Sequence, residues 1–289
     1  MSRFLPLLVG ALVAFTGDVV AQAPPPADSR GEWLFGAEAR RDRITYHFDN
    51  PSSFDTAVLV PHFFEQRYIT DNVWGVATVR YAAGIKWETS LGATPQRTAR
   101  ADDYDTFFDT DGTVWVSGTT GGASIRSLRF SQRAELARLG AVALVAGYRF
   151  RIDRADFQIG HKTITRNGVL VTAIDVTTRE SASSQVHEVF VGAAASRTLN
   201  ERWQLSFEGE LSPTTLGRLL VQLPDKYPGQ DLVFVAKGLA GAARLALMRR
   251  HPRWPIEVSA DAGHIWSYHS TDRLSRDLLG VRASVGRAW

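Results

Sequence analysis

The sequence of 289 residues contains no cysteine, so no disulfide bond can stabilise the fold. Beyond its N-terminal segment it has no run of about 18 consecutive apolar residues, which excludes a protein that crosses a membrane with helices. The formal net charge is only +3, and the basic residues are not gathered into the stripe that a nucleic-acid partner requires. Packing or a closed network of backbone hydrogen bonds must therefore hold the chain together.

The N-terminus has the form of a secretory signal. An apolar run over residues 4–15 is followed by small-residue triplets that signal peptidase accepts. We prefer a cut after Ala21, because the later candidate would leave Pro24 at the new N-terminus. A membrane anchor is the alternative, but the run is shorter than the roughly 20 residues that a helical span needs. We predict a signal peptide over residues 1–21 and a proline-rich periplasmic tail over residues 22–31.

Apolar and polar side chains alternate along most of the remaining chain. The alternation is clearest at residues 203–211 and over residues 279–289, which end on the aromatic Trp289. A period of two means that one face of a β-strand meets an apolar surface and the other does not. Carboxylates and arginines fall mainly on the second face. A bulge is expected near Asp71 and Asn72.

The alternating segments form ten predicted strands, whose connections switch between short turns and mostly longer polar loops. Long loops are expected at residues 95–123, 166–184 and 213–231. An even number of strands with such connections is typical of outer-membrane barrels, in which short turns lie in the periplasm and long loops outside the cell. Closing the sheet pairs every backbone polar group that lipid surrounds.

We therefore predict an all-β fold: a ten-stranded antiparallel transmembrane β-barrel over residues 32–289, with long extracellular loops and short periplasmic turns. Side chains are expected to plug its narrow lumen and to form salt bridges there. A soluble sandwich or a lipocalin-like barrel is the alternative. The expected location is the outer membrane of a Gram-negative bacterium. Outer-membrane lipid and lipopolysaccharide are the expected partners, and the slight positive charge suits the anionic lipopolysaccharide.

The second predicted outer loop is rich in aspartate. Asp103 and Asp105 are followed by residues 109–112, which read Asp-Thr-Asp-Gly. Such a loop is either a solvated surface or a cation site, since Asp-x-Asp-Gly gathers oxygen ligands. Phe107 stands where a calcium loop of the EF-hand type needs a further carboxylate. We therefore expect no bound metal and no cofactor.

The strand number, the outer loops and this Asp-x-Asp pair together resemble the omptin family of outer-membrane proteases. The resemblance covers nearly the whole mature chain at the level of architecture. It implies that Asp103 and Asp105 lie across a groove from an Asp–His pair, with which they activate a water that attacks the peptide carbonyl. Close carboxylates suit this task, because one holds the water while its neighbour keeps a proton. The implied substrate is a peptide or a protein.

The sequence departs from the family at the histidine of that pair. The family's Asp-x-His would fall near residues 212–218, and no histidine occurs between His187 and His251. His269, with inward parity at the outer end of the ninth predicted strand, and His62 are the candidates to replace it. A structural or surface role is the alternative for each.

Omptins also bind lipid A through outward residues on the barrel wall. Here Gly147-Tyr148 matches the family pattern, whereas Phe150 and Ile152 replace its glutamate and arginine. By the resemblance, Tyr148 is a candidate lipid-binding residue. A tyrosine of the interfacial aromatic girdle is the alternative.

Three functions remain open at this level. The first is an omptin-like endopeptidase with Asp103, Asp105 and His269 as catalytic residues. The second is a barrel without this chemistry, which serves through its loops as an adhesin or a structural membrane protein. The third is an enzyme that modifies lipid A, which would use His264 on the lipid-facing wall and requires a polar partner for it there.

Overall fold

The computed structural model describes residues 31–51, 61–109, 111–177, 180–222, 224, 228–229, 231–267 and 272–288. The predicted signal peptide and all but one residue of the predicted tail lie outside these ranges. Within them the chain forms one antiparallel sheet, whose strands are β1 (Glu32–Pro51), β2 (Pro61–Ala83), β3 (Ile85–Phe108), β4 (Val114–Leu139), β5 (Val142–Arg166), β6 (Val169–Thr177), β7 (Ser181–Thr198), β8 (Trp203–Gln222), β9 (Asp231–Arg249), β10 (Ile256–Ser267) and β11 (Asp272–Ala288). No helix among the described residues is long and apolar enough to cross a membrane.

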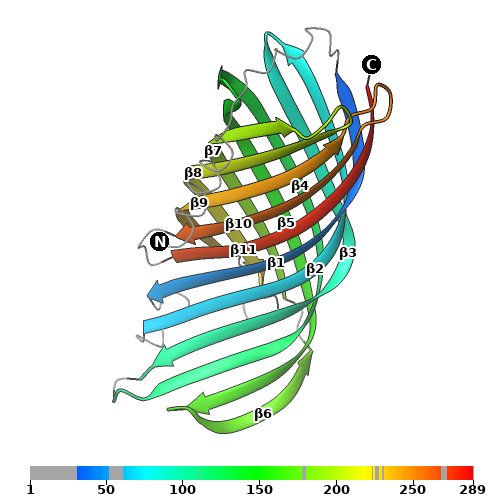
Figure 1. Ribbon diagram of the computed structural model, residues 1–289. Coiled ribbons are helices and arrows are strands. Elements are labelled where there is room, and N and C mark those ends of the chain that lie inside the picture. Colours follow the sequence, from blue (N-terminus) through cyan, green and yellow to red (C-terminus); the bar gives the residue numbers. More distant parts are fainter. Residues whose placement is uncertain are drawn as a thin grey trace.

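The sheet closes on itself into a barrel (Figure 1). Strands that follow one another in sequence pair with each other, except that β6 and β7 both pair with β5, and β1 pairs with β11 from Glu32 to Phe48. Two strands share the edge of β5 that faces away from β4. β7 pairs with β5 as far as Asp156, and β6 pairs with it from Ile159 onward. Ten strands therefore close the barrel, and β6 extends beyond it. The predicted ten-stranded antiparallel barrel is confirmed.

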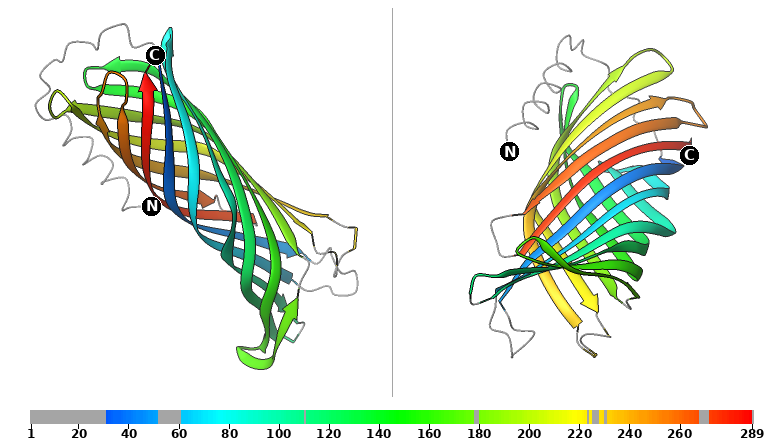
Figure 2. Two further views of the ribbon diagram at one scale, coloured as in Figure 1. Left: turned by 90° about the vertical axis from the view of Figure 1, so that its right-hand side faces the viewer. Right: turned by 90° about the horizontal axis from the view of Figure 1, so that it is seen from below.

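Short turns connect the strands at the end of the barrel that also holds the C-terminus. Gly84 and Gly140 make two of them with φ of 76° and 60°, which glycine adopts without a steric penalty. The opposite end, here called the outer end, carries the β3–β4 and β5–β6 hairpins, and the latter projects farthest (Figure 2). A register shift between Ile69 and Gly75 confirms the bulge expected in β2.

The prediction of three long loops is wrong. Residues 95–123 continue β3 and β4 into a tight hairpin, residues 166–184 contain β6, and β8 runs on to Gln222. The first two segments are rich in Gly, Ser and Thr, because the sheet here leaves the lipid and no longer needs an apolar outward face. A polar composition was therefore mistaken for a loop.

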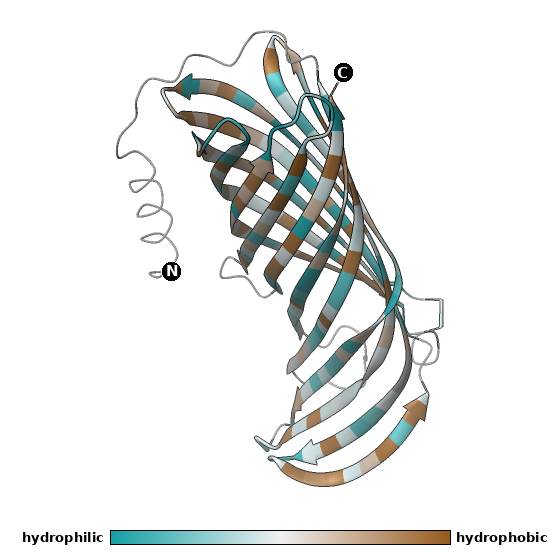
Figure 3. Ribbon diagram, turned by 45° about the vertical axis from the view of Figure 1, so that its right-hand side comes forward, coloured by the Kyte–Doolittle hydropathy of each residue, from teal (hydrophilic) through white to brown (hydrophobic). Residues whose placement is uncertain are grey.

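An apolar belt surrounds the barrel nearer the short turns. On β11, Leu279, Val281 and Val285 point outward with 60%, 54% and 50% of their surface exposed, whereas Arg282 and Ser284 between them are 5% exposed. The same alternation recurs around the wall (Figure 3). Exposed apolar side chains on every second position are stable only against hydrocarbon. The predicted lipid-facing face is confirmed, although Trp289 lies outside the described residues.

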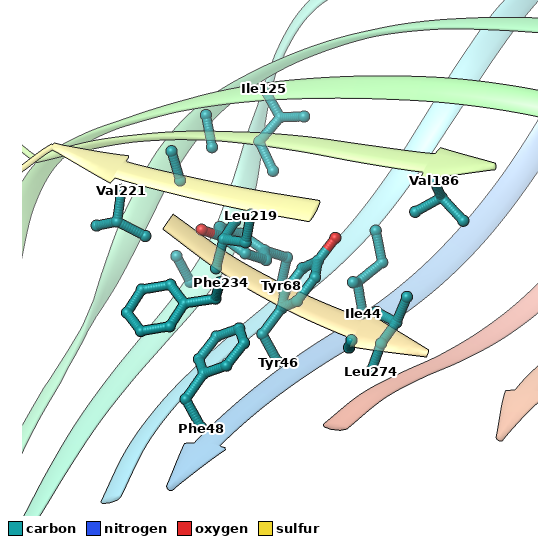
Figure 4. Packing of buried hydrophobic residues seen from close by; sticks show 14 of the residues in the cluster. Ile44, Tyr46, Phe48, Tyr68, Ile125, Val186, Leu219, Val221, Phe234 and Leu274 are labelled. Atoms are coloured by element: carbon teal, nitrogen blue, oxygen red, sulfur yellow. The ribbon is translucent and has the colours of Figure 1, made fainter. Parts of the chain in front are cut away.

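The lumen is filled in two layers of opposite chemistry. Within the belt it holds arginines and buried carboxylates that pair across the barrel. Toward the outer end it holds an apolar cluster, here called the plug (Figure 4), which includes Ile44, Tyr46, Phe48, Tyr68, Ile125, Val186, Leu219, Val221, Phe234 and Leu274. The expected plugged and salt-bridged interior is confirmed, and the apolar half of it is a feature that the sequence did not predict.

Candidate active site at the outer mouth

Asp103 and Asp105 lie on the inner face of β3, just beyond the plug. They follow Ala99 and Ala101 at every second position of the strand, on the same face, and these two alanines are buried in the plug. Asp103 pairs in register with Gln66 of β2, and Asp105 is 8% exposed. Both residues thus belong to a strand that projects above the lumen, and both carboxylates face the interior. This region, with Gln66 and Glu180, is here called the outer mouth.

A third carboxylate, that of Glu180, approaches the outer mouth from the opposite wall. The amide Nε2 of Gln66 donates a hydrogen bond of 2.5 Å to Oε1 of Glu180, which directly precedes β7. The hydroxyl of Tyr68 donates to the side-chain oxygen Oε1 of Gln66 at 2.7 Å. Gln66 is thus the register partner of Asp103 on β3 and the hydrogen-bond donor to Glu180. Carboxylates brought to one region can activate water.

The plug forms the floor of the outer mouth. Tyr46 on β1 and Ser184 on β7 share a hydrogen bond although these strands lie on opposite sides of the barrel. The rings of Phe48 and Phe234 stack with centroids 4.0 Å apart. A substrate bound at Asp103 would therefore lie above the lumen and could not pass through it.

Below the plug, the lumen is braced by charge. Trp74 is fully buried beneath the guanidinium groups of Arg40, Arg129 and Arg151, which lie 5.1 to 5.7 Å from its ring centroid. Glu38 accepts hydrogen bonds from Arg129, and a cavity of about 160 Å³ lies among these side chains. The residual space is large enough for a few waters and too small for a peptide.

The described imidazoles do not face the outer mouth. His47 alternates with the inward Tyr46 and Phe48, so it points outward, as do His161, His187 and His264 by the same parity. His251 lies in the turn between β9 and β10, where it accepts a hydrogen bond from the backbone N–H of Trp254. His269 lies outside the described residues, and the side chain of His62 does too. Of the three predicted catalytic residues, the described part of the structure therefore includes only Asp103 and Asp105.

Two aspartates of the turn between β3 and β4 accept hydrogen bonds from within the turn. Gly112, with φ of 82°, donates its N–H to the carbonyl of Asp109, and the N–H of Thr113 donates to Oδ1 of Asp111 at 2.8 Å. The hydrogen bonds from Thr113 hold the pKa of Asp111 below its ordinary value. Among the described residues no group of three His, Cys, Asp or Glu side chains is placed to hold a metal ion.

Tyr148 points outward from β5 into the apolar belt. Its hydroxyl forms a hydrogen bond of 2.7 Å with Nδ1 of His187 on β7, and the ring of Phe150 lies 4.8 Å from the same imidazole. The pair satisfies two polar groups that would otherwise face hydrocarbon alone. The sequence singled out the tyrosine but not its histidine partner, although both have outward parity on paired strands.

His264 has the polar partner that the third function requires. Its Nδ1 lies 2.6 Å from Oδ1 of Asp277 on the neighbouring strand β11, and its ring is 4.5 Å from that of Trp266. The two residues are register partners on the outward face of β10 and β11. The sequence alone does not indicate this contact, because it depends on the register between β10 and β11.

The fold defines the chain as a closed outer-membrane β-barrel. Among solved structures it is similar to the outer membrane protease OmpT from Escherichia coli, with a TM-score of 0.66, 8% sequence identity, and coverage of 93% of this chain and 100% of that chain. The attachment invasion locus protein Ail of Yersinia pestis matches with a TM-score of 0.34 and 12% identity over 88% of this chain and 99% of that chain. No family model and no curated protein matches the sequence. The resemblance to omptins is therefore confirmed at the level of the fold.

Glu180 is the residue of the outer mouth that sequence reasoning missed. It falls within residues 166–184, which were expected to be a loop. Gln66 and Tyr68 share inward parity on β2, so their orientation could have been predicted. The contact with Glu180 could not, because it joins strands on different sides of the barrel.

Proposed function

We propose that the chain is an omptin-like surface endopeptidase whose water is activated by carboxylates of the outer mouth. The observation that carries this proposal is the position of Asp103 and Asp105, adjacent inward residues beyond the plug of a barrel that has the fold of an outer-membrane protease. The two carboxylates hold the attacking water, and the one that keeps a proton donates a hydrogen bond to the developing oxyanion. His269, which lies outside the described residues, is proposed as the general base that takes the proton of this water.

The chemistry of the outer mouth favours a cationic substrate. Asp103, Asp105 and Glu180 bring carboxylates to one enclosed region. A peptide with paired basic residues would complement their charge, and the plug beneath would keep the scissile bond at the mouth.

Lipopolysaccharide is the proposed membrane partner. Above the apolar belt the outward side chains become charged, and the exposed cations include Arg41, Arg43, Arg126 and Arg154. Guanidinium groups bind phosphate with paired hydrogen bonds, and this band lies at the height of lipid headgroups. Tyr148 would contact the acyl chains from within the belt.

Cleavage of peptides tests the endopeptidase directly. The protein is refolded into bilayers containing lipopolysaccharide and incubated with peptides that carry paired basic residues. Asp103→Asn and Asp105→Asn are expected to lower kcat/KM by about 100-fold or more, and His269→Gln by a similar factor. Asp156→Asn, which changes an exposed outward aspartate of β5, is the matched control and should leave the rate unchanged.

A barrel without this chemistry is the second candidate, and a specific observation favours it. The imidazoles of the described residues all lie outside the outer mouth, so no described histidine can serve Asp103 or Asp105. Wild-type protein that cleaves no peptide under these conditions would establish this candidate, with the projecting hairpins as its binding surface. Cleavage that survives both aspartate substitutions would overturn the proposed site.

A further inference from the structure

The pair formed by His264 and Asp277 has the geometry of a general base with its orienting carboxylate. The distance of 2.6 Å from Nδ1 to Oδ1 places the proton of the imidazole on Nδ1, because an ionised carboxylate can only accept. The lone pair of Nε2 is then free to take a proton. A carboxylate that fixes the tautomer of a histidine in this way is the feature that makes the imidazole useful as a base.

The pair lies at the outer boundary of the apolar belt. Directly below it on the same outward face are Ala262 of β10 and Leu279 of β11, and Leu279 is 60% exposed. Trp266 flanks the imidazole at 4.5 Å, as an aromatic residue of the membrane interface does. The polar heads and the first ester carbonyls of a lipid occupy this level of a bilayer.

A cation completes the arrangement. Arg43 of β1 is the register partner of Asp277, points outward and is exposed. Its neighbour Arg41 forms an ion pair with Asp71, whereas the guanidinium of Arg43 has no ion-pair partner among the residues that the structure describes. The side chain of Arg43 lies on the strand next to Asp277 and on the same outward face, and a guanidinium in such a position can stabilise an oxyanion.

A second His–Asp pair with similar geometry lies in a different environment and can be compared with this one. His161 and Asp175 are also joined through Nδ1, at 2.9 Å, but they lie on the β5–β6 hairpin that projects beyond the barrel. That pair meets water, not lipid. The two pairs differ mainly in what surrounds them, so His161 provides an internal control.

We propose that His264 and Asp277 form a lipid-facing hydrolytic site that cleaves an ester-linked acyl chain of an outer-leaflet lipid. Nε2 of His264 takes a proton from a water, whose oxygen adds to the ester carbonyl carbon. The tetrahedral oxyanion forms beside Arg43. Its collapse breaks the bond to the alcohol oxygen, which takes the proton back from His264. The products are a fatty acid and an alcohol, and the net reaction consumes one water.

In this step His264 is the catalytic residue and Asp277 is a positioning residue. Replacing Asp277 with asparagine removes the preference for the productive tautomer but leaves the lipid-facing surface in place. It should therefore lower kcat without changing KM. A purely structural ion pair would leave both constants unchanged.

Release of fatty acid from proteoliposomes tests the proposal. The full-length mature protein is reconstituted in vesicles of phosphatidylethanolamine alone and in vesicles that also contain lipopolysaccharide, and free fatty acids are measured by mass spectrometry. Wild-type protein should release acyl chains, and release in the first or only in the second vesicles identifies the lipid. His264→Gln should lower the rate about 100-fold and Asp277→Asn at least about tenfold. His161→Gln should leave it unchanged.

Two results would overturn the proposal. One is the absence of acyl release by the wild-type protein from both kinds of vesicle. The other is a rate for His264→Gln equal to that of the wild type, with both proteins shown by their unfolding midpoints to be folded. Neither result bears on the peptide assay, because the outer mouth lies inside the barrel and this pair lies outside it.

Discussion

Nη1 of Arg151 lies 2.9 Å from Oδ2 of Asp42, although β2, β3 and β4 separate their strands in the wall of the barrel. Asp42 is fully buried and also accepts hydrogen bonds from Arg40 at 3.1 Å and Arg276 at 3.0 Å. One carboxylate thus holds three cations from β1, β5 and β11. This contact ties opposite walls together at the centre of the charged layer.

Removal of the charge of Asp42 should destabilise the barrel. Asp42→Asn removes the charge that three buried guanidinium groups share; Arg40 keeps Glu38 and Arg151 keeps Asp153, but Arg276 loses the carboxylate with which it pairs. We expect the free energy of unfolding to fall by about 3–5 kcal/mol. Urea unfolding in lipid bilayers measures this change. The control is Asp71→Asn, because Asp71 pairs with Arg41 at an exposed site and should contribute less than about 1 kcal/mol. Equal effects of the two substitutions would contradict the role of Asp42.

The plug should contribute to stability through packing alone. Phe234→Ala removes the ring that stacks on Phe48 and should lower the free energy of unfolding by about 3–5 kcal/mol. Val233→Ala is the control, since Val233 is the adjacent outward residue and is 48% exposed, so its change should stay within about 0.5 kcal/mol. The same unfolding experiment compares the two variants. A plug that is loosely packed would show no difference between them.

The β5–β6 hairpin depends on its turn. Asn167 and Gly168 have φ of 49° and 80°, the combination of a two-residue type I′ turn. Gly168→Ala forces a side chain into this conformation and should cost about 1 kcal/mol locally. Hydrogen exchange of the β6 amides should accelerate about fivefold, while the unfolding midpoint of the barrel stays the same, because β6 extends beyond the closed sheet.

Gly75→Ala is the control for that experiment. A Cβ at Gly75 would meet only the carbonyl oxygen of Ala93, at 3.9 Å, which is an ordinary contact. It should leave exchange in β6 unchanged. Acceleration by both substitutions would mean that the effect is not specific to the turn.

The alternation of side chains was enough to predict the barrel. On β11 it distinguishes the lipid-facing Leu279 and Val281 from the buried Arg282, and the same physical rule applies to every strand within the belt. The charged layer followed from it, because the second face had to enclose the carboxylates and arginines. A sequence pattern indicates which environment each face of a strand meets. Within the belt the outward face of every strand meets hydrocarbon, so one pattern applies to all of them.

The outer end was harder to predict because lipid no longer surrounds it. There the outward face carries Arg43 and His264 while the inward face carries Tyr46 and Phe234, so the meaning of the alternation reverses. Asn167-Gly168 was a turn signal that the polar composition of residues 166–184 obscured. The contacts of Asp103 with its surroundings depend on register across several strands, which no local pattern contains.

Within the apolar belt every second side chain of the strands meets hydrocarbon, and the closed sheet encloses the others. Because the chain has no native cysteine, single cysteines can be introduced and labelled with a fluorophore. Labels at Val281 and Leu245, outward residues on β11 and β9, should be quenched by nitroxides on lipid acyl chains. A label at the inward Ser284 should not be. Equal quenching at inward and outward positions would contradict the closed barrel.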